Sequence, residues 1–170
     1  MGRIQRLCSY LDKLQCRWTK VNHSKRYRLR RASRRLRQKI KNLVNEVHKK
    51  CSTWLCRNYR CILIPIFDVS NMIQRKKRKI NSRTVRSLLT WSHYKFRERL
   101  INKAKQYNWC KVVVTDEPYT SKTCTNCGWV DKNLGSKKEF YCRECKVELD
   151  RDSNGARNIL IRYLTLNKKK

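Results

Sequence analysis

Two Cys-x-x-Cys pairs, separated by fourteen residues, constrain the fold of this chain more than any other feature of its sequence. Each short turn can aim both of its sulfurs at one point, so the four thiolates predict a tetrahedral zinc site. Four sulfur ligands leave no coordination position open, and the predicted zinc is therefore structural rather than catalytic. Gly128 gives the first turn the φ freedom that it requires, whereas Lys146 takes that place in the second. The predicted zinc ligands are Cys124, Cys127, Cys142 and Cys145.

Acidic residues stand on both sides of this predicted zinc ribbon. Glu117 precedes it, at the carboxyl end of a predicted strand, where α/β sheets place their ligands. Asp152 follows it, at the start of the last predicted helix. If the ribbon is a loop whose ends lie close together, it brings the two carboxylates near each other, and clustered carboxylates with a divalent metal can cut phosphodiesters. Asp152 has a simpler alternative role as a helix N-cap, which Asp150 or Ser153 could fill equally well.

The charge of the chain predicts a polyanionic partner. It has 44 Lys and Arg residues against 12 Asp and Glu residues, a formal net charge of +32. Such a surface binds nucleic acid by releasing counterions, and charge alone does not separate DNA from RNA. No apolar run reaches the length of about 18 residues that a membrane span needs, so no membrane association is expected.

The remaining six cysteines are scattered through helical and strand patterns. Free thiols in a reducing compartment explain them better than disulfides do. We therefore expect an intracellular protein, nuclear if its host is eukaryotic, with no disulfide partner. These cysteines are Cys8, Cys16, Cys51, Cys56, Cys61 and Cys110.

Apolar residues recur at helical spacing over the first third of the chain. They predict a helix over about 3–20, a turn at His23–Lys25, and a longer helix whose apolar stripe comprises Leu29, Leu36, Ile40, Leu43, Val47 and Trp54. Like charges crowd its opposite face and destabilise an isolated helix, so we predict a nucleic-acid contact there rather than an idle solvated face. The predicted contact residues are Arg26, Arg30, Arg31, Arg34, Arg35 and Arg37.

Two buried strands, Cys61–Ile66 and Lys111–Thr115, flank a predicted helix over Ser82–Gln106, which makes one β-helix-β crossover. Pro65 belongs near a strand end or an edge. Before that helix, the loop 74–79 supplies further predicted phosphate contacts, with a nuclear localisation signal as the alternative interpretation. These contacts are Lys76, Lys77 and Arg78. The chain closes with a helix over about 153–164. Two parallel strands alone do not make a stable sheet, so the predicted α/β fold is only part of a fold.

Specific strings surround the cysteine pairs. They are EPYTSKTC at 117–124 and DRDSNGARNIL at 150–160, with Ile64-Pro65, Phe67, Asn81–Val85 and His93–Phe96 farther upstream. Over nearly its whole length the chain resembles the C-terminal part of TnpB-type (OrfB) transposon proteins, and most of all their Fanzor relatives in eukaryotes and giant viruses. Those proteins are related to type V CRISPR effectors. The segment 117–124 also contains Lys122, which joins the predicted nucleic-acid contacts.

The resemblance implies an incomplete RNase H-like (RuvC) fold with a long basic helical pair and an inserted four-cysteine zinc ribbon. The helical pair would occupy 1–60, the strand-helix-strand core 61–118, the target-binding zinc ribbon 119–149, and the final helix with its basic tail 150–170. In that family the domain cleaves DNA under the guidance of a transposon-encoded RNA, with three carboxylates that hold two Mg²⁺ ions. DNA is then the expected partner, together with guide RNA in the full-length protein.

Carried over by motif, Glu117 matches the second acid of that family and Asp152 the third. Bacterial relatives often place the second acid after the earlier strand, which makes Asp68 a reserve candidate. The first acid of the family has no match in this sequence. We therefore expect these 170 residues alone to lack nuclease activity, unless another chain supplies the missing strands. The alternative is a stand-alone DNA- or RNA-binding zinc-ribbon protein without a nuclease role.

Overall fold

The computed structural model describes residues 2–74, 80–115, 120–135 and 138–167. The chain divides into two compact units, which are described one at a time. The first comprises residues 1–59 and 68–110, and the second comprises residues 60–67 and 111–170. Within the described ranges, no helix is both long enough and apolar enough to cross a membrane.

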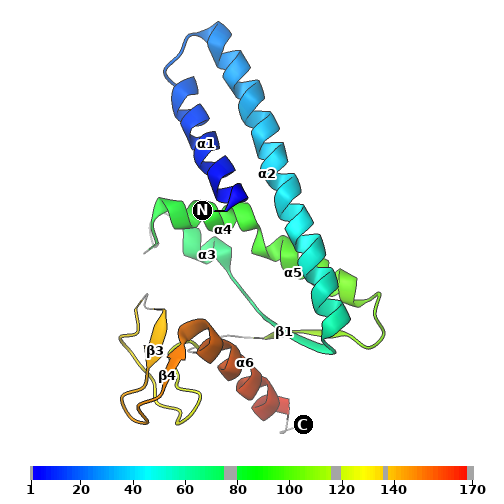
Figure 1. The fold of residues 1–170 in the computed structure, drawn as a ribbon, viewed down its shortest axis with the longest axis vertical. Helices are drawn as coiled ribbons and strands as arrows, with labels where there is room; N and C mark the ends of the chain where they lie inside the picture. The colour runs from blue at the N-terminus through cyan, green and yellow to red at the C-terminus, as the bar shows by residue number, and fades with distance from the viewer. Residues whose placement is uncertain (1, 75–79, 116–119, 136–137, 168–170) are drawn as a thin grey trace. The chain divides into compact units, whose positions relative to one another are not determined.

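The first unit is built on an antiparallel pair of helices, α1 (Arg3–Trp18) and α2 (His23–Asn58) (Figure 1). Leu11 and Leu14 of α1 pack against α2 to form a buried apolar cluster. The prediction of a helix over about 3–20 is confirmed. The predicted turn at His23–Lys25 is wrong, because these residues already belong to α2, whose N-cap is the extended residue Asn22.

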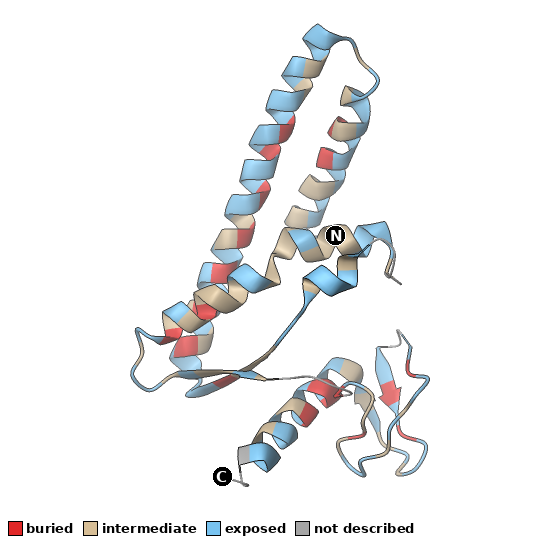
Figure 2. Ribbon diagram, turned by 180° about the vertical axis from the view of Figure 1, so that it is seen from behind, coloured by how far each residue is buried: buried red, intermediate tan, exposed pale blue. Residues whose placement is uncertain are grey.

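The buried stripe of α2 differs from the predicted one in its second half (Figure 2). Val47 and Trp54, predicted to be in the stripe, are 36% and 56% exposed. The first step between successive buried residues is three positions and every later step is four, so the buried stripe follows one ridge of the helix surface. Its second half therefore consists of small and polar side chains instead of the larger apolar ones that were predicted. The buried residues are Ser33, Leu36, Ile40, Val44, His48, Ser52 and Cys56.

Three shorter helices complete the first unit: α3 (Val69–Ile73), α4 (Ser82–Trp91) and α5 (His93–Ala104). The single helix predicted over Ser82–Gln106 is therefore wrong. Ser92 has φ +48° and ψ +59°, a left-handed conformation that ends α4 and redirects the chain into α5. Leu100 of α5 is fully buried, and the ring of Phe96 lies 5.3 Å from that of His48 on α2.

The second unit contains two parallel strands, β1 (Cys61–Pro65) and β2 (Lys111–Thr115), in register from Cys61 with Lys111 to Pro65 with Thr115. The predicted parallel pairing is confirmed, and Pro65 ends its strand as expected. The predicted burial on both faces is wrong. Ile62 is the buried residue of β1, and β2 has only half-buried and exposed residues.

The rest of the second unit is a small hairpin followed by a helix. The hairpin pairs β3 (Glu139–Tyr141) with β4 (Glu148–Asp150) in antiparallel fashion, and α6 (Arg151–Asn167) begins at the next residue. Residues 120–150, which contain the hairpin and all four paired cysteines, form the cysteine ribbon. Helix α6 packs against the hairpin and also contacts β1.

Candidate metal centre and nucleic-acid interface

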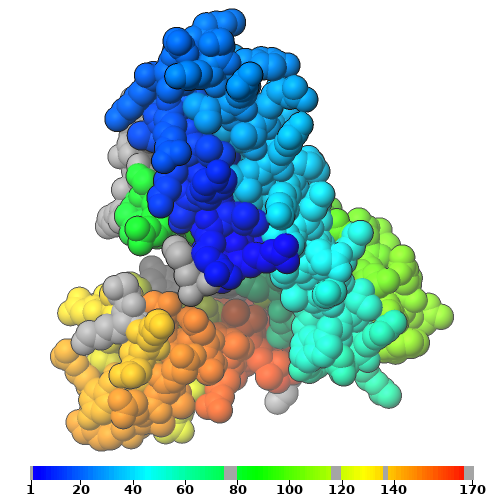
Figure 3. All heavy atoms as spheres, turned by 45° about the horizontal axis from the view of Figure 1, so that its top comes forward, coloured from blue at the N-terminus to red at the C-terminus, as the bar shows by residue number. Residues whose placement is uncertain are grey.

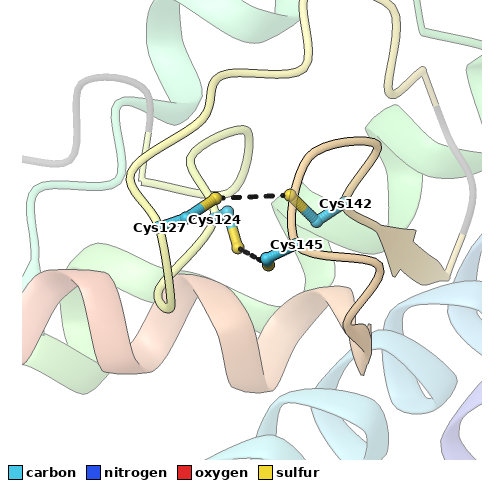
Figure 4. A group of neighbouring side chains, drawn as sticks. All are labelled: Cys124, Cys127, Cys142 and Cys145. Carbon is cyan, nitrogen blue, oxygen red and sulfur yellow. Dashed lines mark hydrogen bonds between the residues drawn. The ribbon is translucent and has the colours of Figure 1, made fainter.

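The cysteine ribbon brings the four paired cysteines to one point (Figure 4). The Sγ atoms of Cys124 and Cys145 lie 3.6 Å apart, and those of Cys127 and Cys142 lie 3.5 Å apart. All four sulfurs lie within 4.8 Å of one another. A tetrahedral zinc with Zn–S bonds of about 2.3 Å separates its sulfurs by about 3.8 Å. The four cysteines are therefore able to hold a metal ion such as zinc.

The two turns that carry these cysteines have the same backbone hydrogen bonds. In the first, the N–H of Cys124 donates to the carbonyl of Trp129 at 2.7 Å, and the N–H of Gly128 donates back to the carbonyl of Cys124 at 3.0 Å. In the second, Cys142 donates to Val147 at 3.0 Å, and Lys146 donates to Cys142 at 3.1 Å. The ribbon thus presents its sulfurs from two equivalent knuckles.

One residue in each knuckle has a left-handed backbone. Gly128 has φ +81°, and Lys146 has φ +60°. Glycine adopts this conformation without steric cost, whereas a lysine Cβ is crowded by the backbone there. Lysine at this position therefore introduces local backbone strain into the second knuckle.

A small apolar cluster supports the knuckles from within the ribbon. Phe140 of β3 is fully buried, and Leu134 is 5% exposed. Cys124 and Cys142 belong to the same cluster, so two of the four sulfurs lie in an apolar environment. Burial of this kind excludes water from the metal site and holds the ligands in place.

Hydrogen bonds set the protonation of the outer two cysteines. The side chain of Asn126 and the backbone N–H of Val147 lower the pKa of Cys145 to about 6, because such bonds favour the thiolate. At Cys127 the backbone N–H of Trp129 has the same lowering effect, but burial and hydrogen bonds from neighbouring thiols prevail and raise the pKa to about 12. The surroundings of Cys145 thus favour its thiolate form, and those of Cys127 favour its protonated form.

Two asparagines of α6 fasten the helix to the first knuckle. The fully buried Asn154 donates to the carbonyl of Thr123 at 2.8 Å and accepts from the N–H of Thr125 at 3.1 Å. Asn158, one turn later, donates to the carbonyls of Thr120 and Thr123 at 2.8 and 2.6 Å. This clamp was not predicted from the sequence. The spacing of two asparagines by four positions was the available signal.

The two acids at the start of α6 have different roles. Asp150 is the N-cap: its Oδ1 accepts from the N–H groups of Asp152 and Ser153 at 3.0 and 2.9 Å. The bond from Ser153 is the main reason that the pKa of Asp150 is lowered. The side chain of Asp152 is 85% exposed, and its Oδ1 lies 3.3 Å from the guanidinium of Arg151. Asp152 is therefore free of capping and available to a ligand.

Of the other two predicted carboxylates, the structure describes Asp68 but not Glu117. Glu117 lies outside the described residues. Asp68 caps the short helix α3, where its carboxylate accepts from Ser70 and from the N–H of Asn71, and these bonds lower its pKa. Among the residues that the structure describes, the four cysteines are the one close group of three or more potential metal ligands.

The predicted nucleic-acid contacts on α2 lie mostly on its exposed side. The set comprises Arg30, Arg31, Arg34, Arg35 and Arg37, called the arginine face. Glu46 is the single acidic residue of α2, and in the described ranges no carboxylate pairs with any member of the arginine face. Arg30 lies over the ring of Trp18 at 5.4 Å, and Arg31 lies over that of Tyr27 at 5.9 Å.

The remaining predicted contacts lie elsewhere. Arg26 of α2 is half-buried, and its side chain donates to the carbonyl of Val21 in the preceding turn at 3.4 Å, so it is not part of the arginine face. Lys122 is half-buried in the ribbon. The basic loop contacts Lys76, Lys77 and Arg78 lie outside the described residues.

Comparison with known proteins shows which family the chain resembles. Residues 93–159 match the model of the Cas12f1-like TNB domain, a range that includes α5, β2, the four cysteines and the first half of α6. A TnpB-like protein of Acanthamoeba polyphaga mimivirus is 33% identical over 140 residues, which make up 82% of this chain and 26% of the relative. The CRISPR-associated endodeoxyribonuclease Cas12f1 of Sulfoacidibacillus thermotolerans is 32% identical over 130 residues, or 74% of this chain and 29% of that protein.

A solved structure has the same mixed α/β fold. A chain in the cryo-EM structure of a Cas12f1–sgRNA–target DNA complex superposes with a TM-score of 0.58 and 21% identity, over 91% of this chain and 41% of that one. The chain belongs to the TnpB-type proteins and corresponds to a C-terminal portion of them. It spans between a quarter and a third of the length of the two curated relatives described.

Proposed function

We propose that this chain is the nucleic-acid-binding, cysteine-ribbon portion of a TnpB-type RNA-guided DNA endonuclease. Relatives carry names that describe an endodeoxyribonuclease, and the similar fold comes from a complex with sgRNA and target DNA. Within that protein, this portion would contribute part of an RNase H-like (RuvC) core, with zinc as a structural ion in the ribbon. Glu117 and Asp152 would contribute carboxylates to a Mg²⁺ site.

The observation that carries the binding role is the arginine face of α2. Its guanidinium groups are exposed, and in the described residues none has a carboxylate partner. The mutual repulsion of these charges is relieved when phosphates replace counterions beside them. Arginine is also suited to the task because its planar group binds phosphate oxygens in pairs.

For the 170 residues alone, we propose binding without cleavage. Two-metal phosphodiester hydrolysis needs carboxylates gathered around both ions. Asp152 has an exposed carboxylate, but among the described residues the four cysteines are the one close group of three or more potential metal ligands. The portion would thus supply ligands to a site that needs further protein to be complete.

The binding role is tested by salt titration of fluorescence anisotropy with a labelled DNA duplex. Each lost phosphate contact lowers the slope of log affinity against log salt by about 0.9. The variant Arg31→Gln/Arg34→Gln/Arg35→Gln should therefore reduce the slope by about three. The variant Lys13→Gln/Arg17→Gln/Lys20→Gln, which removes the same charge from exposed positions on and after α1, is the matched control and should change the slope much less. If both variants lower the salt slope equally, the arginine face is not a specific binding surface.

Cleavage is tested with the same chain and Mg²⁺ or Mn²⁺. The proposal expects no strand scission above that of an Asp152→Ala or Glu117→Ala variant. Metal-dependent cutting that either substitution abolishes would show that the chain is active by itself. Binding without any cutting, in the presence of the upstream portion of a full-length relative as well, would favour a stand-alone binding protein.

A further inference from the structure

We infer that a groove between α2 and α5 binds an unpaired strand of nucleic acid, as a second contact separate from the arginine face. The inference rests on the proposed nucleic-acid-binding function and specifies the form of its ligand. The groove has a volume of about 690 Å³, and its walls come from α2 and α5 of one compact unit. It continues into a smaller cavity of about 270 Å³, which shares Asn45 and Lys95 with it. Figure 3 shows the lower part of α2 beside α5 at the surface.

Cations line both walls of this α2–α5 groove, and those on α5 form a regular row. On α5, Lys95, Arg99 and Lys103 follow one another at intervals of four residues. Residues at this spacing lie on one face of a helix, so the row extends about 12 Å along the groove. On α2, Lys49 lines the groove and Lys41 lines the adjoining cavity.

Little within the groove neutralises these charges. Among the described residues, Glu98 is the single acidic residue that lines the groove, and it lies 4.0 Å from Arg97. In the described residues, Lys41, Lys49 and Lys95 have no carboxylate partner. Cations that line a concave surface attract a chain of phosphates more strongly than those of a flat surface do, because the low-dielectric walls focus the field.

Two buried nitrogen atoms also lack a hydrogen-bond partner among the described residues. Nε of Arg99 lies at the groove, and Nδ1 of His48, a residue that is only 4% exposed, lies at the adjoining cavity. Buried polar atoms are nearly always hydrogen-bonded in folded proteins. Orphaned nitrogens beside a groove are therefore a second indication, independent of the charge, that a polar ligand completes it.

The uncharged lining residues favour an unpaired strand over a duplex. Asn45 and Asn102 offer side-chain amides, which can hydrogen-bond the exposed edges of bases. Tyr94 is 63% exposed at the groove, with the guanidinium of Arg97 5.3 Å from its ring, and can stack on the face of a base. A duplex hides the Watson–Crick edges and the faces of its bases and presents mainly phosphates, which the arginine face can contact.

The test compares one sequence in three labelled forms: single-stranded DNA, single-stranded RNA and the DNA duplex. The variant Lys41→Gln/Lys49→Gln/Lys95→Gln changes only exposed side chains of the groove and its adjoining cavity. We expect it to lower the salt slope for single strands by about two, at about 0.7 per lost contact, and to leave duplex binding unchanged. A larger effect on RNA than on DNA, or the reverse, would identify which strand the groove takes.

Two outcomes would overturn the inference while the proposed function stands. In one, the groove variant binds single strands as the wild type does, although the arginine-face variant loses affinity. In the other, the groove variant loses single-strand and duplex affinity equally. A wild-type chain that binds none of the three forms would overturn both. Acetylation of the wild-type chain gives a check that needs no variant: a bound single strand should protect Lys41, Lys49 and Lys95, and a bound duplex should not.

Discussion

Gly128 and Lys146 occupy the same position in two equivalent knuckles, and both have a left-handed backbone. Their N–H groups donate to the carbonyls of Cys124 and Cys142 at 3.0 and 3.1 Å. Glycine fits this position and lysine does not, so the two knuckles hold their sulfurs at different conformational cost.

Substitutions of Gly128 and of Lys146 should have different effects on zinc affinity. Gly128→Ala places a Cβ in the left-handed region at a cost of about 1–2 kcal/mol, so zinc affinity should fall about tenfold. Lys146→Gly removes a similar cost and should not weaken binding. Competition with a chromophoric chelator measures both. Lys132→Gly, at an exposed lysine without a positive φ, is the control for the flexibility of glycine. Backbone strain at Lys146 would be ruled out if Lys146→Gly lowered zinc affinity as much as Lys132→Gly does.

Zinc affinity should rise with pH. A metal binds thiolates, so every thiol must lose its proton on binding. The pKa of Cys127 is about 12, so this cysteine releases a proton throughout the neutral range, whereas Cys145, with a pKa of about 6, is already mostly ionised above pH 7. Affinity should therefore increase by at least about tenfold per pH unit from about 7 to 9. A pH-independent affinity over that range, measured by chelator competition, would contradict the protonation states assigned here.

Asn154→Ala should loosen the junction between α6 and the cysteine ribbon. The substitution removes a fully buried amide and leaves the N–H of Thr125 without its acceptor, at a cost of about 1–3 kcal/mol in the free energy of unfolding. Hydrogen exchange at Thr125 should accelerate. Arg157→Ala, at an exposed position on the same helix, should change stability by less than about 0.5 kcal/mol. Equal stability of the two variants would rule out the clamp.

Asp150 and Asp152 should separate in their effects on stability and on activity. Asp150→Ala removes the N-cap of α6 and should lower the unfolding midpoint by several degrees, whereas Asp152→Ala should leave it unchanged. The pKa of Asp150 is lowered in the folded chain, so its contribution is complete above its unfolded pKa of about 3.9 and disappears as the pH falls through the folded value. In a complete nuclease, Asp152→Ala should abolish cleavage. Thermal unfolding at neutral and acidic pH, together with a cleavage assay, gives both readouts.

The sequence predicted features that depend on local chemistry. The cysteine spacing located the four sulfurs that the structure brings together, and the apolar runs located both strands and their parallel pairing. It failed where tertiary packing overrides local preference. Ser92 has no glycine or proline beside it to announce a left-handed break, and the exposure of Trp54 depends on the direction that α2 takes along its partners.

The functional residues divide in the same way, into those that local sequence predicts and those that depend on tertiary packing. The basic face of α2 could be predicted from the spacing of its cations. The role of Lys95, Arg99 and Lys103 could not, because it depends on α5 lying beside α2. Sequence analysis left the N-cap open among Asp150, Asp152 and Ser153, because all three residue types favour that position. The hydrogen bonds to Asp150 decide it and leave Asp152 exposed.

The pairing of β1 with β2 has a consequence for how the chain is made. In the described residues, β1 has no other strand partner, and β2 follows it only after the whole of α3, α4 and α5. During synthesis, the apolar segment Cys61–Pro65 therefore leaves the ribosome with an open edge and waits while the intervening helices are translated. Co-translational chaperone binding and aggregation should thus concentrate on β1, and a pause in translation before residue 111 should worsen both.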